Sequence, residues 1–148
     1  EGSMTAPNPI AVKRCIEEAV LDAEISAAQI DVINGHLTAT SKDGLEIQNW
    51  SEALKRSGVD FPYINSLKGM TGHCLAASGS IECVASVLEL KHQFLFPNIN
   101  LHTVHDEVLE HISESKIPRV KTALKFNYLA KASFGFGDVN CCLIFKTF

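Results

Sequence analysis

The chain has 148 residues, which is enough for one domain with a complete hydrophobic core. Its composition, with 46% hydrophobic and 20% charged residues, is that of a globular protein. The formal net charge of −4, without a long run of one sign, argues against a nucleic-acid binder, because such proteins need a clustered basic face. The densest basic group is interpreted as a solvated strand edge in preference to a docking surface; it consists of Lys116, Arg119, Lys121 and Lys125.

The apolar runs are too short to span a bilayer, and the start of the chain lacks a signal-peptide pattern. We therefore expect a cytoplasmic protein without a membrane partner. The cysteines are odd in number and lack both a disulfide framework and the paired CxxC motifs of a zinc site. We expect reduced, buried structural thiols and no metal. The five residues are Cys15, Cys74, Cys83, Cys141 and Cys142.

Regular elements are predicted in chain order from hydrophobic periodicity and from capping residues. An asparagine N-cap followed by proline begins a helix over about 8–23. A short strand at 30–33 and a second amphipathic helix at about 45–56 follow. The next elements are a short strand at 62–66 and a helix at about 72–92. The last helix is small or apolar on most sides in its first half, which predicts that it is buried.

The final third of the chain reads as an irregular stretch and a hairpin. The stretch 97–118 lacks periodicity except for a possible helical turn at 106–111. Two strand-like segments, 120–132 and 139–148, are joined by a glycine-bearing turn at 133–138. The order helix, strand, helix, strand, helix, hairpin predicts a layered α/β protein. The loops that follow the strands of such sheets collect functional residues.

Two histidines and one lysine stand out in these loops. For His36 alone, a loop histidine held by a backbone carbonyl is the commoner explanation. His73 lies near the start of the third predicted helix, where the helix dipole disfavours a protonated imidazole. Two neutral histidines aimed at one oxygen would stabilise an enolate or an oxyanion. Lys68 would support such a site by its charge; the alternative is an exposed, solvated lysine.

Cys74 adjoins His73 near a helix N-terminus, a position that lowers a thiol pKa. Neighbours on a helix nevertheless point about 100° apart, whereas a nucleophile and its base need hydrogen-bond reach. We therefore favour a buried packing cysteine over a nucleophile. The chain contains no phosphate-binding, dinucleotide-binding or HExxH motif, and we expect no cofactor. The remaining histidines are interpreted as surface or structural residues: His92, His102, His105 and His111.

Three short segments carry a shared pattern: NGHLTAT at 34–40, KGMTGH at 68–73 and SFGFGDVN at 133–140. Together they resemble the C-terminal half of the β-ketoacyl-acyl-carrier-protein synthases, the condensing enzymes of fatty-acid and polyketide synthesis. The family shows Asn-x-His-Gly-Thr-x-Thr, Lys-x-x-x-Gly-His and Ser-Phe-Gly-Phe-Gly-Gly-x-Asn at these places. PNINL at 97–101 is similar to a further family segment, Pro-x-x-Asn-Leu. The resemblance covers nearly the whole chain.

The resemblance implies a thiolase-like layered α-β-α fold with a mixed sheet and a buried central helix. Residues 1–148 would form its C-terminal domain, and the N-terminal half with the nucleophilic cysteine would be absent from this chain. The implied reaction is a decarboxylative Claisen condensation. An acyl group on an enzyme cysteine is joined to malonyl on carrier protein, with loss of carbon dioxide.

The same resemblance implies roles for the matched residues. His36 and His73 would stabilise the enolate, and Lys68 would support His73 and the local charge. The implied substrate-binding residues are Thr38 and Thr40, which would hold the pantetheine arm, together with Phe134 and Phe136. The backbone N–H of Phe136 would help form an oxyanion hole, and its ring would gate the acyl pocket. Glu46 is similar to the acidic residue that follows the first histidine motif of the family.

Three departures from the family pattern suggest a divergent branch: Leu37 and Asp138 replace glycines, and Ala39 replaces a serine. None of the cysteines lies in the nucleophile's motif, so we expect no condensing activity from this chain alone. The implied partners are acyl carrier protein, a cysteine-bearing half and a second copy of the complete enzyme. A non-catalytic partner subunit, similar to a chain-length factor, is the alternative. A thiolase or another acyl-CoA condensing enzyme is a third hypothesis.

Overall fold

A four-stranded mixed sheet organises the protein, whose computed structural model describes Met4 and residues 7–147. The strand order is β2 (Tyr63–Asn65), β1 (Val32–Asn34), β5 (Tyr128–Phe134) and β6 (Asn140–Lys146). Strand β1 runs parallel to both β2 and β5, whereas β5 and β6 form an antiparallel hairpin. A separate antiparallel pair joins β3 (Phe94–Leu95) to β4 (Thr122–Ala123).

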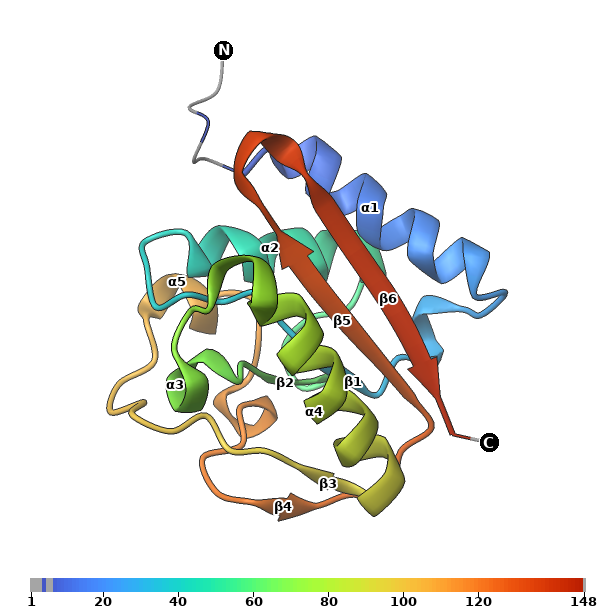
Figure 1. The fold of residues 1–148 in the computed structure, drawn as a ribbon, viewed down its shortest axis with the longest axis vertical. Coiled ribbons are helices and arrows are strands. Elements are labelled where there is room, and N and C mark those ends of the chain that lie inside the picture. Colours follow the sequence, from blue (N-terminus) through green and yellow to red (C-terminus); the bar gives the residue numbers. More distant parts are fainter. Residues whose placement is uncertain (1–3, 5–6, 148) are drawn as a thin grey trace.

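Helices cover both faces of this sheet. Helices α1 (Pro9–Asp22) and α2 (Asp43–Leu54) lie on one face, and α4 (Ser78–His92) lies across the other, along β5 and β6 (Figure 1). A short helix, α3 (Lys68–Thr71), follows β2. Another short helix, α5 (Asp106–Leu109), packs on α2. This α-β-α layering with a mixed sheet confirms the predicted fold class.

Alternation along β5 divides the hydrophobic core between the two faces. Ala130, Ala132 and Phe134 join the main cluster, which is built on Trp50 beneath α1 and α2. Leu129 belongs to a smaller cluster on the α4 side. Successive strand residues point to opposite faces, so Lys131 also faces α4. The strand therefore places one charged side chain in the layer between helix and sheet.

The first predicted helix begins where the sequence placed it. The side chain of Asn8 accepts the backbone N–H of Ile10 at 3.1 Å, and Pro9 occupies the first turn. The other predicted elements, apart from the third helix and the long strand, are present with ends shifted by a few residues. The prediction of one long strand over 120–132 is wrong, because the chain forms two strands there, β4 and β5, with a non-strand stretch between them. Phe148, the last residue of the other predicted strand, lies outside the described residues.

The third helix begins at Ser78, and the prediction that it starts near Gly72 is wrong. Gly72 adopts a backbone φ of +72° and Leu75 a φ of +51°, and neither conformation continues a right-handed helix. A separate helix, α3, therefore precedes an irregular loop, and a short 3₁₀ turn spans Leu75–Ala77. His73 lies in this loop, one turn before α4.

Helix α4 buries several polar side chains and exposes several apolar ones, although Ala85 and Leu90 are also buried. Ser78, Glu82, Ser86 and Glu89 are buried against the sheet. The apolar side chains on the other side are exposed to fractions between 37% and 62%; they are Ile81, Val84, Val87 and Leu88. The expected burial of this helix is thus realised on one face within the described chain. Among the described helices, none is both long enough and apolar enough to cross a membrane.

All five cysteines are free thiols, but they are not all buried. Cys15, Cys83 and Cys142 are half-buried, and burial raises the pKa of the Cys142 thiol to about 12. Cys74 and Cys141 are exposed, so the prediction of buried packing thiols is wrong for these two. Cys74 lies in the loop before α4 instead of on the helix. Cys141 lies on the exposed side of the edge strand β6, opposite the core-facing Cys142.

Candidate active site

Two carboxylates at the start of α2 hold the loop that carries His36. Glu46 accepts the backbone N–H of His36 at 2.7 Å and that of Leu37 at 2.8 Å. Asp43 accepts the backbone N–H groups of Thr38 and Ala39, each at 3.1 Å. Burial raises the pKa of Glu46 to about 7, although the two backbone hydrogen bonds oppose this rise. The loop backbone is therefore anchored to α2, which leaves the side chains of His36 and Thr38 free to line a pocket.

His73 is oriented by contacts on one ring nitrogen. Its Nδ1 accepts the backbone N–H of Leu75 at 3.0 Å and lies 3.2 Å from the hydroxyl of Ser78. Because a backbone N–H can only donate, the ring proton of a neutral His73 lies on Nε2. His73 is exposed, as are its neighbours in the loop. The loop thus presents an N–H donor at its surface.

The rings of His36 and His73 meet edge to face, with centroids 5.5 Å apart and an angle of 81° between planes. The ring of Phe134 lies 6.3 Å from that of His36. Burial, together with the positive charges of Lys68 and Lys131, lowers the pKa of His36 to about 4. His36 is therefore a neutral imidazole at physiological pH. Its Nδ1 atom has no hydrogen-bond partner among the described residues.

Lys68 is buried, with 9% of its surface exposed, so the alternative of a solvated lysine is wrong. Its ammonium group donates to Glu82 Oε1 at 2.5 Å. Burial lowers the pKa of Lys68, whereas the hydrogen bond to Glu82 raises it. The second carboxylate oxygen of Glu82 lies 2.8 Å from the ammonium of Lys131. Glu82 and Lys131 were not predicted from the sequence, where the available signal was a single lysine within the apolar strand YLAKASF.

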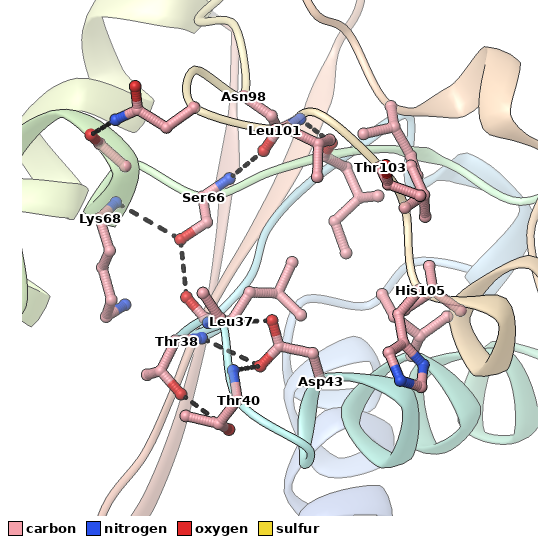
Figure 2. A pocket seen from close by; sticks show the side chains of 18 of the residues that line it. Leu37, Thr38, Thr40, Asp43, Ser66, Lys68, Asn98, Leu101, Thr103 and His105 are labelled. Atoms are coloured by element: carbon pink, nitrogen blue, oxygen red, sulfur yellow. Dashed lines mark hydrogen bonds between the residues drawn. The ribbon is translucent and has the colours of Figure 1, made fainter.

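Two neighbouring cavities open beside the histidines. One, of about 530 Å³, is lined by the two histidines, by Phe134 and Phe136, and by Thr38 and Thr40. The other, of about 640 Å³, runs from Thr38, Thr40 and Lys68 past Leu37 towards apolar core side chains (Figure 2). The hydroxyls of Thr38 and Thr40 lie 3.3 Å apart and line both cavities.

The two phenylalanines of the closing motif differ in their burial. Phe134 is 9% exposed and packs in the main core, whereas Phe136 is 66% exposed at the rim of the smaller cavity. Cys74 lies close by, but its backbone N–H donates to Ser78 Oγ at 2.8 Å and its thiol faces Thr71 O at 3.5 Å. Since His73 Nδ1 is occupied by Leu75 and Ser78, that atom is not available to Cys74 as a base.

Comparison with known proteins agrees with this geometry. The sequence model described as "Beta-ketoacyl synthase, C-terminal domain" matches residues 1–102. The 3-oxoacyl-[acyl-carrier-protein] synthase 2 of Vibrio harveyi is 36% identical over 132 residues, which are 88% of this chain and 31% of that protein. The chloroplastic 3-oxoacyl-[acyl-carrier-protein] synthase I of Arabidopsis thaliana is 33% identical over 98% of this chain and 30% of its own length.

Solved structures give the same match in three dimensions. A ketosynthase complex with a type II polyketide synthase acyl-carrier protein superposes with a TM-score of 0.85 at 31% identity, over 98% of this chain and 35% of that chain. A β-ketoacyl synthase from Burkholderia phymatum superposes with a TM-score of 0.86 at 28% identity, over 99% of this chain and 35% of that chain. The chain thus spans about a third of the length of these relatives. Since the family's model matches more than half of it, this chain belongs to the β-ketoacyl synthase family.

Proposed function

We propose that this chain supplies the histidine pair of a 3-oxoacyl-acyl-carrier-protein synthase. The convergence of His36 and His73 at 5.5 Å, with His36 neutral, carries this proposal. In a decarboxylative condensation the malonyl thioester loses carbon dioxide. The electron pair of the broken carbon–carbon bond then forms an enolate. Its carbon attacks the carbonyl of an acyl thioester on a cysteine, the carbon–sulfur bond breaks, and the cysteine thiolate leaves. An enolate oxygen needs neutral hydrogen-bond donors more than it needs a base.

Each matched residue has a part in this scheme. The Nε2–H of His73 and the ring of His36 would stabilise the enolate oxygen, and Lys68 would add positive charge. Thr38 and Thr40 would bind the pantetheine arm of acyl carrier protein, since their paired hydroxyls line both cavities. The backbone N–H of Phe136 would contribute to an oxyanion hole at the cavity rim.

The nucleophile and the remaining walls of the site would come from a cysteine-bearing half. This inference is supported by the exposed apolar side chains of α4, including Val84 at 62% and Val87 at 48%. The loop that carries His73 is exposed beside the same face. A single surface would therefore cover α4 and close the site. The complete enzyme would act as a homodimer.

The test is malonyl decarboxylation by the assembled protein, meaning this chain together with the cysteine-bearing half. His36→Ala and His73→Ala should each lower the rate by about 10²–10³-fold, the usual effect of losing one oxyanion donor. His102→Ala, which alters an exposed side chain that is not part of the lining of either cavity, should leave it unchanged. Full activity in both site variants would favour the non-catalytic partner subunit.

A second experiment, thiol labelling, locates the nucleophile. A thiol-reactive acyl-chain mimic, followed by peptide mapping, should label a cysteine outside this chain. Labelling of Cys74 would contradict the proposed division of the site. This chain by itself should show no β-ketoacyl formation, and measurable condensation by it alone would be equally decisive against the scheme.

A further inference from the structure

Two lysines share one carboxylate between α4 and the sheet. Glu82 Oε1 lies 2.5 Å from the ammonium of Lys68, and Glu82 Oε2 lies 2.8 Å from that of Lys131. All three residues are buried, with exposed fractions of 9% for Lys68, 1% for Glu82 and 2% for Lys131. The resemblance to known enzymes assigned a role to Lys68, whereas Lys131 has no role in the site described so far.

The ammonium group of Lys131 is fixed on three sides. Besides the carboxylate of Glu82, it donates to the backbone carbonyl of Ala132 and to the hydroxyl of Ser133 at 3.0 Å. A lysine carries three N–H donors, and each has an oxygen within reach. Lys131 is also paired in register with Asn34, two residues before His36. The charge is thus held at a defined place close to the histidine loop.

The charges of this cluster do not balance. Lys68 and Glu82 alone would form a neutral pair, and Lys131 adds one further positive charge to a buried layer. Burying an unmatched charge is costly, and a neutral side chain of similar length would fill the same space. The cluster therefore costs stability that packing alone does not require. A cost of this kind is typical of functional sites.

The excess charge acts on His36. Four titratable neighbours face this ring: Lys68 on α3, Lys131 on β5, His73 in the adjacent loop and Glu82 on α4. Burial is the largest cause of the lowered pKa of His36; the two lysines and His73 lower it as well, and Glu82 raises it. Glu82 contributes least of the four, so the surrounding charges together oppose protonation of His36, and the contribution of Lys131 is second to that of Lys68. Lys131 also acts on the thiols of Cys83 and Cys142, which flank it on α4 and β6.

We propose that Lys131 is a positioning residue of the histidine pair, whose fixed positive charge disfavours a second positive charge on His36 and favours an anion beside it. Its ammonium group does not touch the reacting atoms. It acts through Glu82 and through its field at His36. The second half of this inference rests on the proposed function, whereas the first half concerns the protonation of His36 and stands by itself.

The experiment compares Lys131→Met, which keeps the side-chain length without the charge, with Lys131→Arg, which keeps the charge. Lys146→Met, the same substitution at an exposed position of the neighbouring strand, is the matched control. Two quantities are measured on the assembled protein. Histidine-selective carbon-13 NMR follows the titration of His36, and malonyl decarboxylation is followed as a function of pH.

Lys131→Met should move the titration of His36 and the acid limb of the rate profile to higher pH by about one unit. Lys131→Arg and Lys146→Met should retain the wild-type curves. Lys131→Met should also fold, because Lys68 and Glu82 remain as a neutral pair. Should it fail to fold, Lys131→Gln, which still hydrogen-bonds Ser133, carries the same expectation.

Superimposable His36 titrations in wild type and in the neutral variants would overturn the proposal. An equal loss of malonyl decarboxylation activity in Lys131→Arg and Lys131→Met would also overturn it, because it would reveal a purely steric role. If even the wild-type assembly fails to decarboxylate malonyl thioester, the proposed function fails. The NMR titration still decides the electrostatic role of Lys131 in that case.

Discussion

The carboxylate of Glu46 lies beneath the histidine loop and accepts the backbone N–H of His36 at 2.7 Å and of Leu37 at 2.8 Å. Helix α2 thereby fixes the backbone from which the His36 side chain projects. Glu46 is buried, and its pKa rises to about 7 from an ordinary value near 4.5. Since the folded state prefers the protonated acid, the stability contributed by Glu46 is fully present below about pH 4.5. It is lost as the pH rises through about 7.

Glu46→Gln removes this titration and one of the two acceptors. Relative to the variant, the wild-type protein should lose roughly 3 kcal/mol of unfolding free energy between pH 4.5 and pH 8. Urea unfolding of both proteins across this range measures the difference. Glu17→Gln, at an exposed position of α1 and with Glu46 intact, should keep the wild-type pH dependence of the unfolding free energy. A constant difference between wild type and Glu46→Gln would show that the acid does not titrate in this range.

Ser78 orients His73 from the first turn of α4. Its hydroxyl lies 3.2 Å from His73 Nδ1 and accepts the backbone N–H of Cys74 at 2.8 Å. Ser78→Ala removes both contacts and loosens the ring, so malonyl decarboxylation by the assembled protein should fall about tenfold, the equivalent of about 1–2 kcal/mol. Ser80→Ala, exposed on the same helix, is the control. Equal rates in the two variants would mean that Leu75 alone holds the imidazole.

The shared carboxylate predicts an asymmetry between its partners. Glu82→Gln leaves two buried ammonium groups without an anion and should lower the unfolding free energy by about 3–5 kcal/mol. Lys68→Met should cost less, because Glu82 retains Lys131 at 2.8 Å. Denaturant unfolding at neutral pH ranks the two variants. The reverse ranking would place the stabilising interaction on Lys68 instead of on the shared carboxylate.

Capping residues and short motifs in the sequence predicted the helix starts and loops that depend on neighbouring residues. The Asn8–Pro9 cap places the start of α1, and the three motifs place the loops that the fold brings together at the pocket. The separate strand β3 was missed, because two residues carry no periodicity. The start of the third helix was misplaced because small residues suit a helix, whereas the backbone at Gly72 and Leu75 turns away from one.

The electrostatic part of the site could not be predicted in this way. Lys131 and Glu82 come from different elements and meet only when α4 lies across β5. The burial of α4 was inferred from its apolar composition, yet its buried face carries Glu82 and Glu89, and several of its large apolar side chains are exposed. Hydrophobicity indicates that a face is covered, but it does not say whether the same chain covers it.

The exposed apolar face of α4 yields the last prediction. Val84 is 62% exposed, and a glutamate there should leave the fold of this chain intact while placing a charge in the proposed interface. Val84→Glu should therefore abolish association with the cysteine-bearing half, measured by analytical ultracentrifugation, and with it malonyl decarboxylation. Val59→Glu, 76% exposed on the loop after α2, should assemble normally. Normal assembly of Val84→Glu would show that this face remains uncovered in the complete enzyme, and the missing wall of the histidine site would then have to be sought elsewhere.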